Sequence, residues 1–156
     1  SLVGSEMCIR DSICRSPMCQ SIFTHMVKEQ NLTNHFKIDS AATSREEIGN
    51  PPHYGTAGKL RQVGIPLIPH RAEQMTKADY DAYDYLIGMD SMNIRNMERI
   101  TGHRKGDKIY KLLEFAGLEA DCRDPWYTSR FDETYRDVVT GCTAFLECLQ
   151  KEGKIC

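Results

Sequence analysis

An arginine near the start of the chain stands where a loop is expected to enter a helix. Arg15 comes directly before Ser16 and Pro17, and the apolar residues that follow repeat at helical spacing. Serine is a favoured N-cap, and proline suits the first helical position because no backbone N–H is needed there. A helix N-terminus offers unpaired N–H groups and a partial positive charge, and the guanidinium adds a bidentate donor. These residues predict a site for a phosphate-like anion, with an ordinary capped helix as the alternative.

A second group of residues that could take part in a reaction lies in a polar loop late in the chain. Asp124 precedes Pro125, and proline biases the residue before it away from helix. Trp126, the only tryptophan in the chain, and Tyr127 follow as an aromatic pair. The two rings could flank a flat aromatic substrate and exclude water from it. The alternative for an isolated Asp-Pro is a simple turn.

Residues 13–18, Ile-Cys-Arg-Ser-Pro-Met, resemble the second half of the phosphate-binding loop of the low-molecular-weight protein tyrosine phosphatases, bacterial type. The similarity extends over residues 13–150. It implies a phosphoric monoester hydrolase that acts on phosphotyrosine or aryl phosphates through a cysteinyl-phosphate intermediate, without a cofactor. Further motifs match in the same order: Asp-Ser-Ala-Ala-Thr-Ser and Ile-Gly-Asn-Pro-Pro within 39–52, Gly-Ile-Pro at 64–66, Asp-Tyr-Leu-Ile-Gly-Met-Asp at 84–90, and Asp-Pro-Trp-Tyr at 124–127.

The resemblance implies a role for each residue that matches a family motif. Asp124 would protonate the departing phenolate and later take a proton from water. Arg15 would bind the equatorial oxygens of the phosphoryl group, and Ser16 would donate a hydrogen bond to the thiolate. The other implied site residues are Ser12, Ile13 and Cys14 at the phosphate, Ser40, His70 and Asp90 as supports of the phosphate loop, and Trp126, Tyr127 and Glu46 on the substrate wall.

The first half of the phosphate loop departs from the family. The family pattern is a nucleophilic cysteine, five residues, then arginine; counted back from Arg15, the cysteine position holds Ile9. Cys8 is one residue out of register, and a misplacement of ~1 Å can lower a rate roughly 100-fold. Asp11 stands where the family has glycine, and its carboxylate would repel a phosphate dianion. We therefore predict that hydrolysis is impaired in this copy.

Three other positions bear on regulation and substrate. Cys14 matches the family's second loop cysteine, which implies a reversible disulfide with the nucleophile, and here that partner is missing. Glu46 stands where the family often has an aromatic residue, which would disfavour an acidic phosphopeptide. Asp90 follows an apolar run and is expected either to reach the phosphate loop or to cap the next helix.

The pattern of apolar residues predicts an α/β fold. Strand and helix patterns alternate, which favours a three-layer sandwich with a small, mainly parallel sheet flanked by helices. The resemblance implies four strands with the first one interior. Gly4, Ser5 and Glu6 predict that this first strand is degraded, since a central parallel strand is nearly all apolar. We interpret residues 1–12 as a non-native or divergent segment, 13–150 as the phosphatase-like domain and 151–156 as a tail. Helices are predicted over 16–30, 56–63, 76–83, 91–100 and 131–150, and strands over 35–39, 85–89 and 109–115.

Composition excludes several other classes. The chain has 156 residues, which suits one domain, and its net charge of −2 gives no basic excess for nucleic acid. No apolar run approaches the ~18 residues of a membrane span. The seven cysteines show no C-x-x-C pair and the histidines are scattered, so we expect reduced thiols in the cytoplasm and no metal site.

Two alternative functions remain. An arsenate reductase would share the fold and a similar loop, but that chemistry needs a relay of further cysteines, and none lies between Cys19 and Cys122. A non-catalytic phosphate-binding module would use Arg15 and the helix N-terminus alone. For the phosphatase, the expected partner is a phosphotyrosine protein or a small aryl phosphate.

Overall fold

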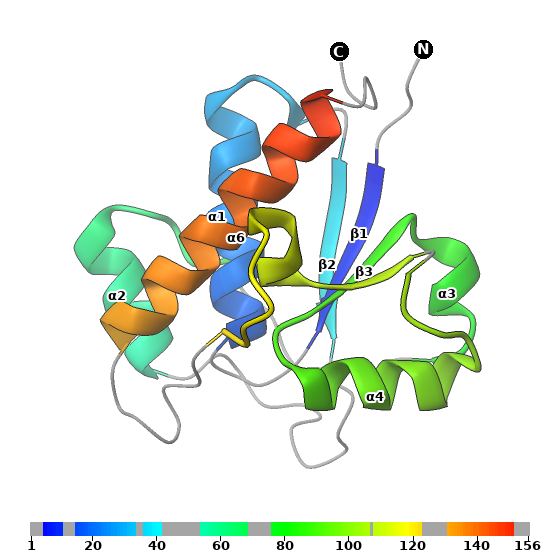
Figure 1. The fold of residues 1–156 in the computed structure, drawn as a ribbon. Coiled ribbons are helices and arrows are strands. Elements are labelled where there is room, and N and C mark those ends of the chain that lie inside the picture. Colours follow the sequence, from blue (N-terminus) through cyan, green and yellow to red (C-terminus); the bar gives the residue numbers. More distant parts are fainter. Residues whose placement is uncertain are drawn as a thin grey trace.

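The computed structural model describes residues 5–10, 15–33, 36–41, 54–68, 76–106, 108–122 and 131–151. Within these residues, four strands form one parallel sheet in the order β2-β1-β3-β4 (Figure 1). This is the small parallel sheet with an interior first strand that the sequence led us to expect. The strands are β1 (Ser5–Arg10), β2 (Phe36–Ala41), β3 (Tyr85–Gly88) and β4 (Ile109–Lys111).

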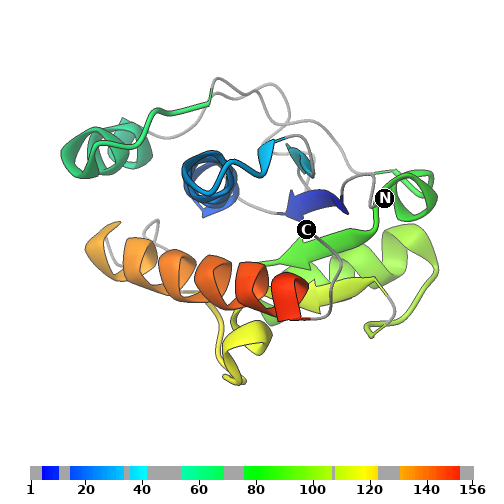
Figure 2. The ribbon, with the colours of Figure 1, turned by 90° about the horizontal axis from the view of Figure 1, so that it is seen from above.

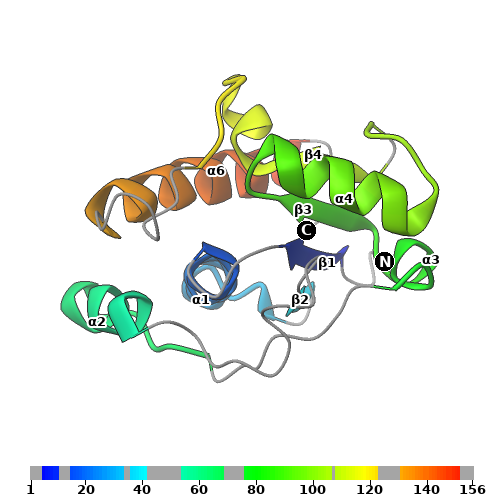
Figure 3. The same cartoon turned by 90° about the horizontal axis from the view of Figure 1, so that it is seen from below.

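Helices cover both faces of the sheet and complete the three predicted layers (Figures 2 and 3). α1 (Arg15–Glu29) and α6 (Phe131–Lys151) pack together over one face, and α2 (Tyr54–Val63) packs against both. α3 (Asp79–Ala82) and α4 (Ser91–Thr101) lie over the other face. Each of these five helices overlaps a helical segment that the sequence pattern predicted, with bounds that differ by at most three residues. None of the helices among the described residues combines the length and apolar character needed to cross a membrane.

The first strand corrects one expectation. The sequence predicted a degraded strand, because Ser5 and Glu6 are polar where a central strand is usually apolar. Instead, Ser5–Arg10 pairs with β2 along its whole length and with β3 from Met7 onward. Backbone hydrogen bonds form whatever the side chains are, so two complete neighbouring strands can stabilise a polar strand between them. The non-native origin of residues 1–12 stays a prediction.

The strand predicted over 109–115 is wrong in its second half. β4 ends at Lys111, and Leu112–Ala116 forms a 3-10 helix, η3, which ends at Gly117 in the left-handed conformation (φ 76°). Leu112 and Leu113 are consecutive and both buried in the same cluster. A strand would direct consecutive side chains to opposite faces, whereas a tight helical turn brings both toward the core.

The core consists of one cluster on each face of the sheet. Phe145 lies in the larger cluster, between the sheet, α1 and η3; its ring centroid lies 4.5 Å from that of Phe115 and 5.4 Å from that of Phe23. The smaller cluster lies between α3, α4 and the sheet and contains Tyr80, Leu86, Ile94, Met97 and Ile109. The two clusters hold α1 and α4 against the sheet, and the first turns of these two helices border the ends of the strands.

Candidate active site

The four parallel strands end together on one side of the sheet, which we call the carboxyl edge. Arg10, the last residue of β1, pairs with Ala41 at the end of β2 and with Gly88 at the end of β3. Gly88 in turn pairs with Lys111, the last residue of β4. Ligands of open α/β sheets bind outside the carboxyl ends of the strands, where the strand order reverses. Here that place is next to β1.

α1 begins at the carboxyl edge, as the sequence predicted, but it starts at Arg15, so Ser16 and Pro17, which were expected as the N-cap and the first helical residue, lie inside its first turn. Its first residue, Arg15, is five positions beyond Arg10, and the helix then runs back along the sheet (Figure 1). The first turn of α1 contains no acidic residue, so its unpaired N–H groups and partial positive charge favour an anion. Arg15 and Ser16 therefore belong to a helix N-terminus beside the end of β1, while the contacts of their side chains stay a prediction.

The position assigned to the missing nucleophile is next to last in β1. Ile9 pairs with Ser40 in β2 and with Ile87 in β3. The structure thus brings Ser40 to the carboxyl edge beside the nucleophile position. Its predicted role as a support of the phosphate loop remains a prediction.

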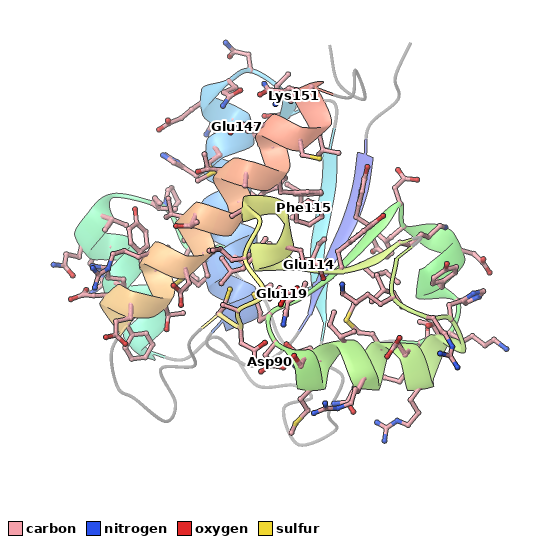
Figure 4. The ribbon with its side chains drawn as sticks, in the orientation of Figure 1. Asp90, Glu114, Phe115, Glu119, Glu147 and Lys151 are labelled. Carbon is pink, nitrogen blue, oxygen red and sulfur yellow. The ribbon has the colours of Figure 1, made fainter. Side chains whose placement is uncertain are left out.

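Asp90 follows β3 and is the N-cap of α4, one of the two roles expected for it (Figure 4). Its carboxylate accepts a hydrogen bond from Asn93 N at 2.8 Å, and Asn93 Oδ1 accepts one from Asp90 N at 3.2 Å. Asn93 Oδ1 also accepts from Met89 N at 3.0 Å, so the cap connects the end of β3 to the start of α4. Contact between Asp90 and the phosphate loop stays a prediction.

A charged network at the same edge was missed by sequence reasoning. Asp121 Oδ1 accepts hydrogen bonds from Ser91 N at 3.1 Å and from Lys111 Nζ at 3.0 Å. Partial burial raises the pKa of Asp121, but the hydrogen bond and charge of Lys111, together with the donors of Ser91, outweigh this effect and lower the pKa below its ordinary value. The available signal was a lysine within the strand predicted over 109–115 and a carboxylate shortly before Asp124, but pairing them requires the fold.

The remaining predicted site residues lie outside the described residues, and their roles stay predictions. They belong to the phosphate loop, to the segment after β2, to the segment before α3 and to the loop before α6. They are Ser12, Ile13 and Cys14; Glu46; His70; and Asp124, Trp126 and Tyr127.

Known proteins share these features over nearly the whole chain. The chain is 38% identical over 146 residues to the low molecular weight protein-tyrosine-phosphatase YfkJ of Bacillus subtilis. This alignment covers 92% of this chain and 94% of that protein. It is also 38% identical over 143 residues to the human low molecular weight phosphotyrosine protein phosphatase, with coverage of 87% and 89%. Such relatives are named protein-tyrosine phosphatases, which are phosphoric monoester hydrolases.

Solved structures give the same result. The crystal structure of YfkJ matches this fold with a TM-score of 0.87 at 36% identity and covers 97% of each chain. The low molecular weight protein tyrosine phosphatase SP-PTP of Streptococcus pyogenes matches with a TM-score of 0.81, also at 36% identity, over 93% of each chain. The family model described as low molecular weight phosphotyrosine protein phosphatase matches residues 7–155. In sequence and in fold, therefore, this chain belongs to the low molecular weight phosphotyrosine protein phosphatase family.

Proposed function

We propose that this chain is built to hydrolyse phosphotyrosine in proteins, or small aryl phosphates, through a cysteinyl-phosphate intermediate, and that Ile9 impairs the reaction in the chain as written. The observation that supports this best is one hydrogen bond at the carboxyl edge, from Cys122 N to Met89 O at 2.9 Å. It joins the residues just before Asp124 to the end of β3, the strand that pairs with β1.

This hydrogen bond limits the distance between the points where two segments leave the sheet, the loop that leads to Arg15 and the segment that leads to Asp124. Met89 follows Gly88, which pairs with Arg10 at the end of β1. Asp124 is two residues beyond Cys122, so its Cα lies at most about 7 Å from that of Cys122. The loop that leads to the arginine and the segment that leads to the acid thus leave from adjacent strand ends, which supports a shared site.

The proposed reaction has two steps. In the first, a thiolate at the nucleophile position attacks phosphorus; the S–P bond forms, the P–O bond to the phenol breaks, and Asp124 gives its proton to the phenolate oxygen. In the second, Asp124 takes a proton from water, the water oxygen bonds to phosphorus, and the S–P bond breaks to release phosphate and the thiolate. The N-terminus of α1 and Arg15 stabilise the charge on the equatorial oxygens in both steps.

The residue at position 9 accounts for the impairment. Ile9 has no group that can attack phosphorus. Cys8 is the preceding residue of the same strand, and consecutive strand positions belong to opposite faces of a sheet. We therefore expect that Cys8 does not replace the missing nucleophile.

Hydrolysis of phenyl phosphate tests the proposal. We define the restored variant as Ile9→Cys combined with Asp11→Gly, which returns the family's nucleophile and glycine. The chain as written is expected to show only background hydrolysis, and the restored variant measurable turnover. Adding Asp124→Asn to the restored variant should lower kcat about 10²–10⁴-fold, the usual contribution of a general acid. Equal rates for the chain as written and the restored variant would refute the impairment, and the absence of any turnover in a folded restored variant would refute the phosphatase proposal.

Non-catalytic phosphate binding is a second candidate function, because Ile9 at the nucleophile position cannot attack phosphorus. It predicts phosphate binding by the chain as written and no turnover in the restored variant. An arsenate reductase is less well supported, because Cys19, Cys122 and Cys142 are buried and so are poorly placed for a thiol relay. Thiol-dependent reduction of arsenate by the restored variant would reverse that judgement.

A further inference from the structure

Asp121 is anchored to two elements at the carboxyl edge. Its Oδ1 accepts hydrogen bonds from Ser91 N at 3.1 Å, Ser91 Oγ at 3.3 Å and Lys111 Nζ at 3.0 Å. Ser91 is the first residue of α4, and Lys111 Nζ also lies 3.2 Å from Ser91 Oγ, so the three side chains form a closed set of contacts. We propose that Asp121, held by Ser91 and Lys111, is a positioning residue for Asp124. This inference rests on the proposed function, in which Asp124 is the general acid.

The next residue supplies an independent backbone anchor. Cys122 is buried, and its N–H donates to Met89 O at 2.9 Å. Asp121 and Cys122 are thus fixed at adjacent positions, one through its side chain and one through its backbone. Two adjacent anchors set both the place and the direction in which the chain leaves the carboxyl edge. Only three peptide units separate Asp121 from Asp124, which limits their Cα atoms to a separation of about 11 Å.

The effect on stability is expected to be small. The side chain of Lys111 is 12% exposed, but that of Asp121 is 50% exposed, and ion pairs with an exposed partner contribute little to the free energy of unfolding. Positioning is different, because a shift of ~1 Å in a reacting group can lower a rate roughly 100-fold. Loss of the anchor should therefore change the chemistry more than the stability.

Trp126 allows the first test, which needs no enzymatic activity. It is the only tryptophan in the chain and lies five residues beyond Asp121, so its fluorescence reports on the segment that contains Asp124. We expect Asp121→Ala and Lys111→Met each to change the acrylamide quenching constant and the anisotropy of Trp126, with little change in Tm. The control is Glu119→Gln, which removes an exposed charge two residues before Asp121 (Figure 4). Within the described residues, the Glu119 side chain makes no hydrogen bond or ion pair.

The leaving group gives the second test, in the restored variant. Phenolate needs a proton as it departs, whereas p-nitrophenolate is a much weaker base and needs it far less. Misplacement of Asp124 should therefore lower kcat/KM, which reports only the first step, by roughly 10–100-fold for phenyl phosphate and hardly change it for p-nitrophenyl phosphate. A purely structural loss would lower both rates alike. Asp121→Asn keeps an acceptor for Ser91 but loses the attraction of Lys111, so an intermediate effect is expected.

The outcomes separate the two proposals. If Asp121→Ala leaves Trp126 quenching and anisotropy equal to those of Glu119→Gln, the positioning role is refuted. The same holds if it lowers kcat/KM equally for both leaving groups. If Asp124→Asn leaves the phenyl phosphate rate of the restored variant unchanged, the proposed function fails, and the Trp126 measurements still decide whether Asp121 fixes this segment.

Discussion

The close packing of α6 on η3 depends on the absence of a side chain at Gly141. A Cβ at this position would lie 2.3 Å from Leu112 Cγ and 2.9 Å from Leu112 Cδ2. Leu112 is completely buried, with 0% of its surface exposed, so it has little room to move away. Gly141→Ala therefore sets a favourable helix propensity against a severe clash in the core.

The expected balance is destabilising. Alanine gains about 1 kcal/mol over glycine inside a helix, whereas overpacking a core costs about 1–3 kcal/mol, occasionally more. The 2.3 Å contact places this site at the upper end, so we expect a net loss of about 1–2 kcal/mol in the free energy of unfolding. For a chain of this size that lowers Tm by roughly 2–8 °C. Urea and thermal unfolding followed by circular dichroism would measure both quantities.

The chain offers a matched control in another helix. Gly58 lies inside α2, and a Cβ there would meet no atom of the described residues within 4 Å, so Gly58→Ala should stabilise the protein by about 0.5–1 kcal/mol. Leu112→Ala alone should cost about 2–5 kcal/mol. Combined with Gly141→Ala, it should cost less than the sum of the two single changes, because the new methyl group fills part of the cavity. A Gly141→Ala variant as stable as Gly58→Ala would contradict the packing described here.

Three further predictions concern caps and titrating groups. Asp90→Ala removes the acceptor for Asn93 N and should lower the free energy of unfolding by about 0.5–2 kcal/mol, whereas Asp90→Asn should have a much smaller effect; urea unfolding tests both. Because the folded pKa of Asp121 is lowered, its carboxylate stabilises the fold above the unfolded pKa of about 3.9. The difference in the free energy of unfolding between the chain and Asp121→Asn, measured by urea unfolding, should shrink as pH falls through the folded pKa. A difference that stays constant with pH would contradict this prediction. The hydrogen bond with Cys142 and, to a smaller degree, burial raise the pKa of Cys19, so the unfolded state loses this proton first as pH rises above about 8.5. Above that pH the free energy of unfolding should therefore fall by up to about 1.4 kcal/mol per pH unit more steeply than in Cys19→Ala. Equal slopes of the free energy of unfolding against pH in the two proteins would refute the assignment.

Much of the fold follows from local patterns. The apolar run that became β3 and the spacing of three and four that became α6 need no knowledge of the rest of the chain. Two elements required tertiary information. β1 is a strand because β2 and β3 supply paired backbone on both sides, which its polar residues gave no reason to expect. η3 replaces the second half of a predicted strand because Leu112 and Leu113 both pack into one cluster.

Local sequence patterns predicted the helix ends at the candidate site, but they did not predict its contacts between different elements. The pattern around Arg15 correctly located a helix N-terminus at the end of the first strand, and Asp90 proved to be an N-cap, one of the two roles considered. The link between Asp121 and Lys111 joins residues ten apart in the sequence on different elements, and no local periodicity marks it. An ion pair of this kind depends on how the end of a strand, the start of a helix and the following loop come together in the fold.

Calorimetric titration with inorganic phosphate tests the central claim, that a phosphoryl group binds at the N-terminus of α1 beside Arg15. We expect the chain as written to bind phosphate, and Arg15→Ala to weaken that binding by roughly 10–150-fold, the loss of a hydrogen bond to a charged group worth about 1.5–3 kcal/mol. Arg99→Ala, in the last turn of α4, should leave the affinity unchanged. Phosphate binding of equal affinity in the chain and in Arg15→Ala would contradict the account.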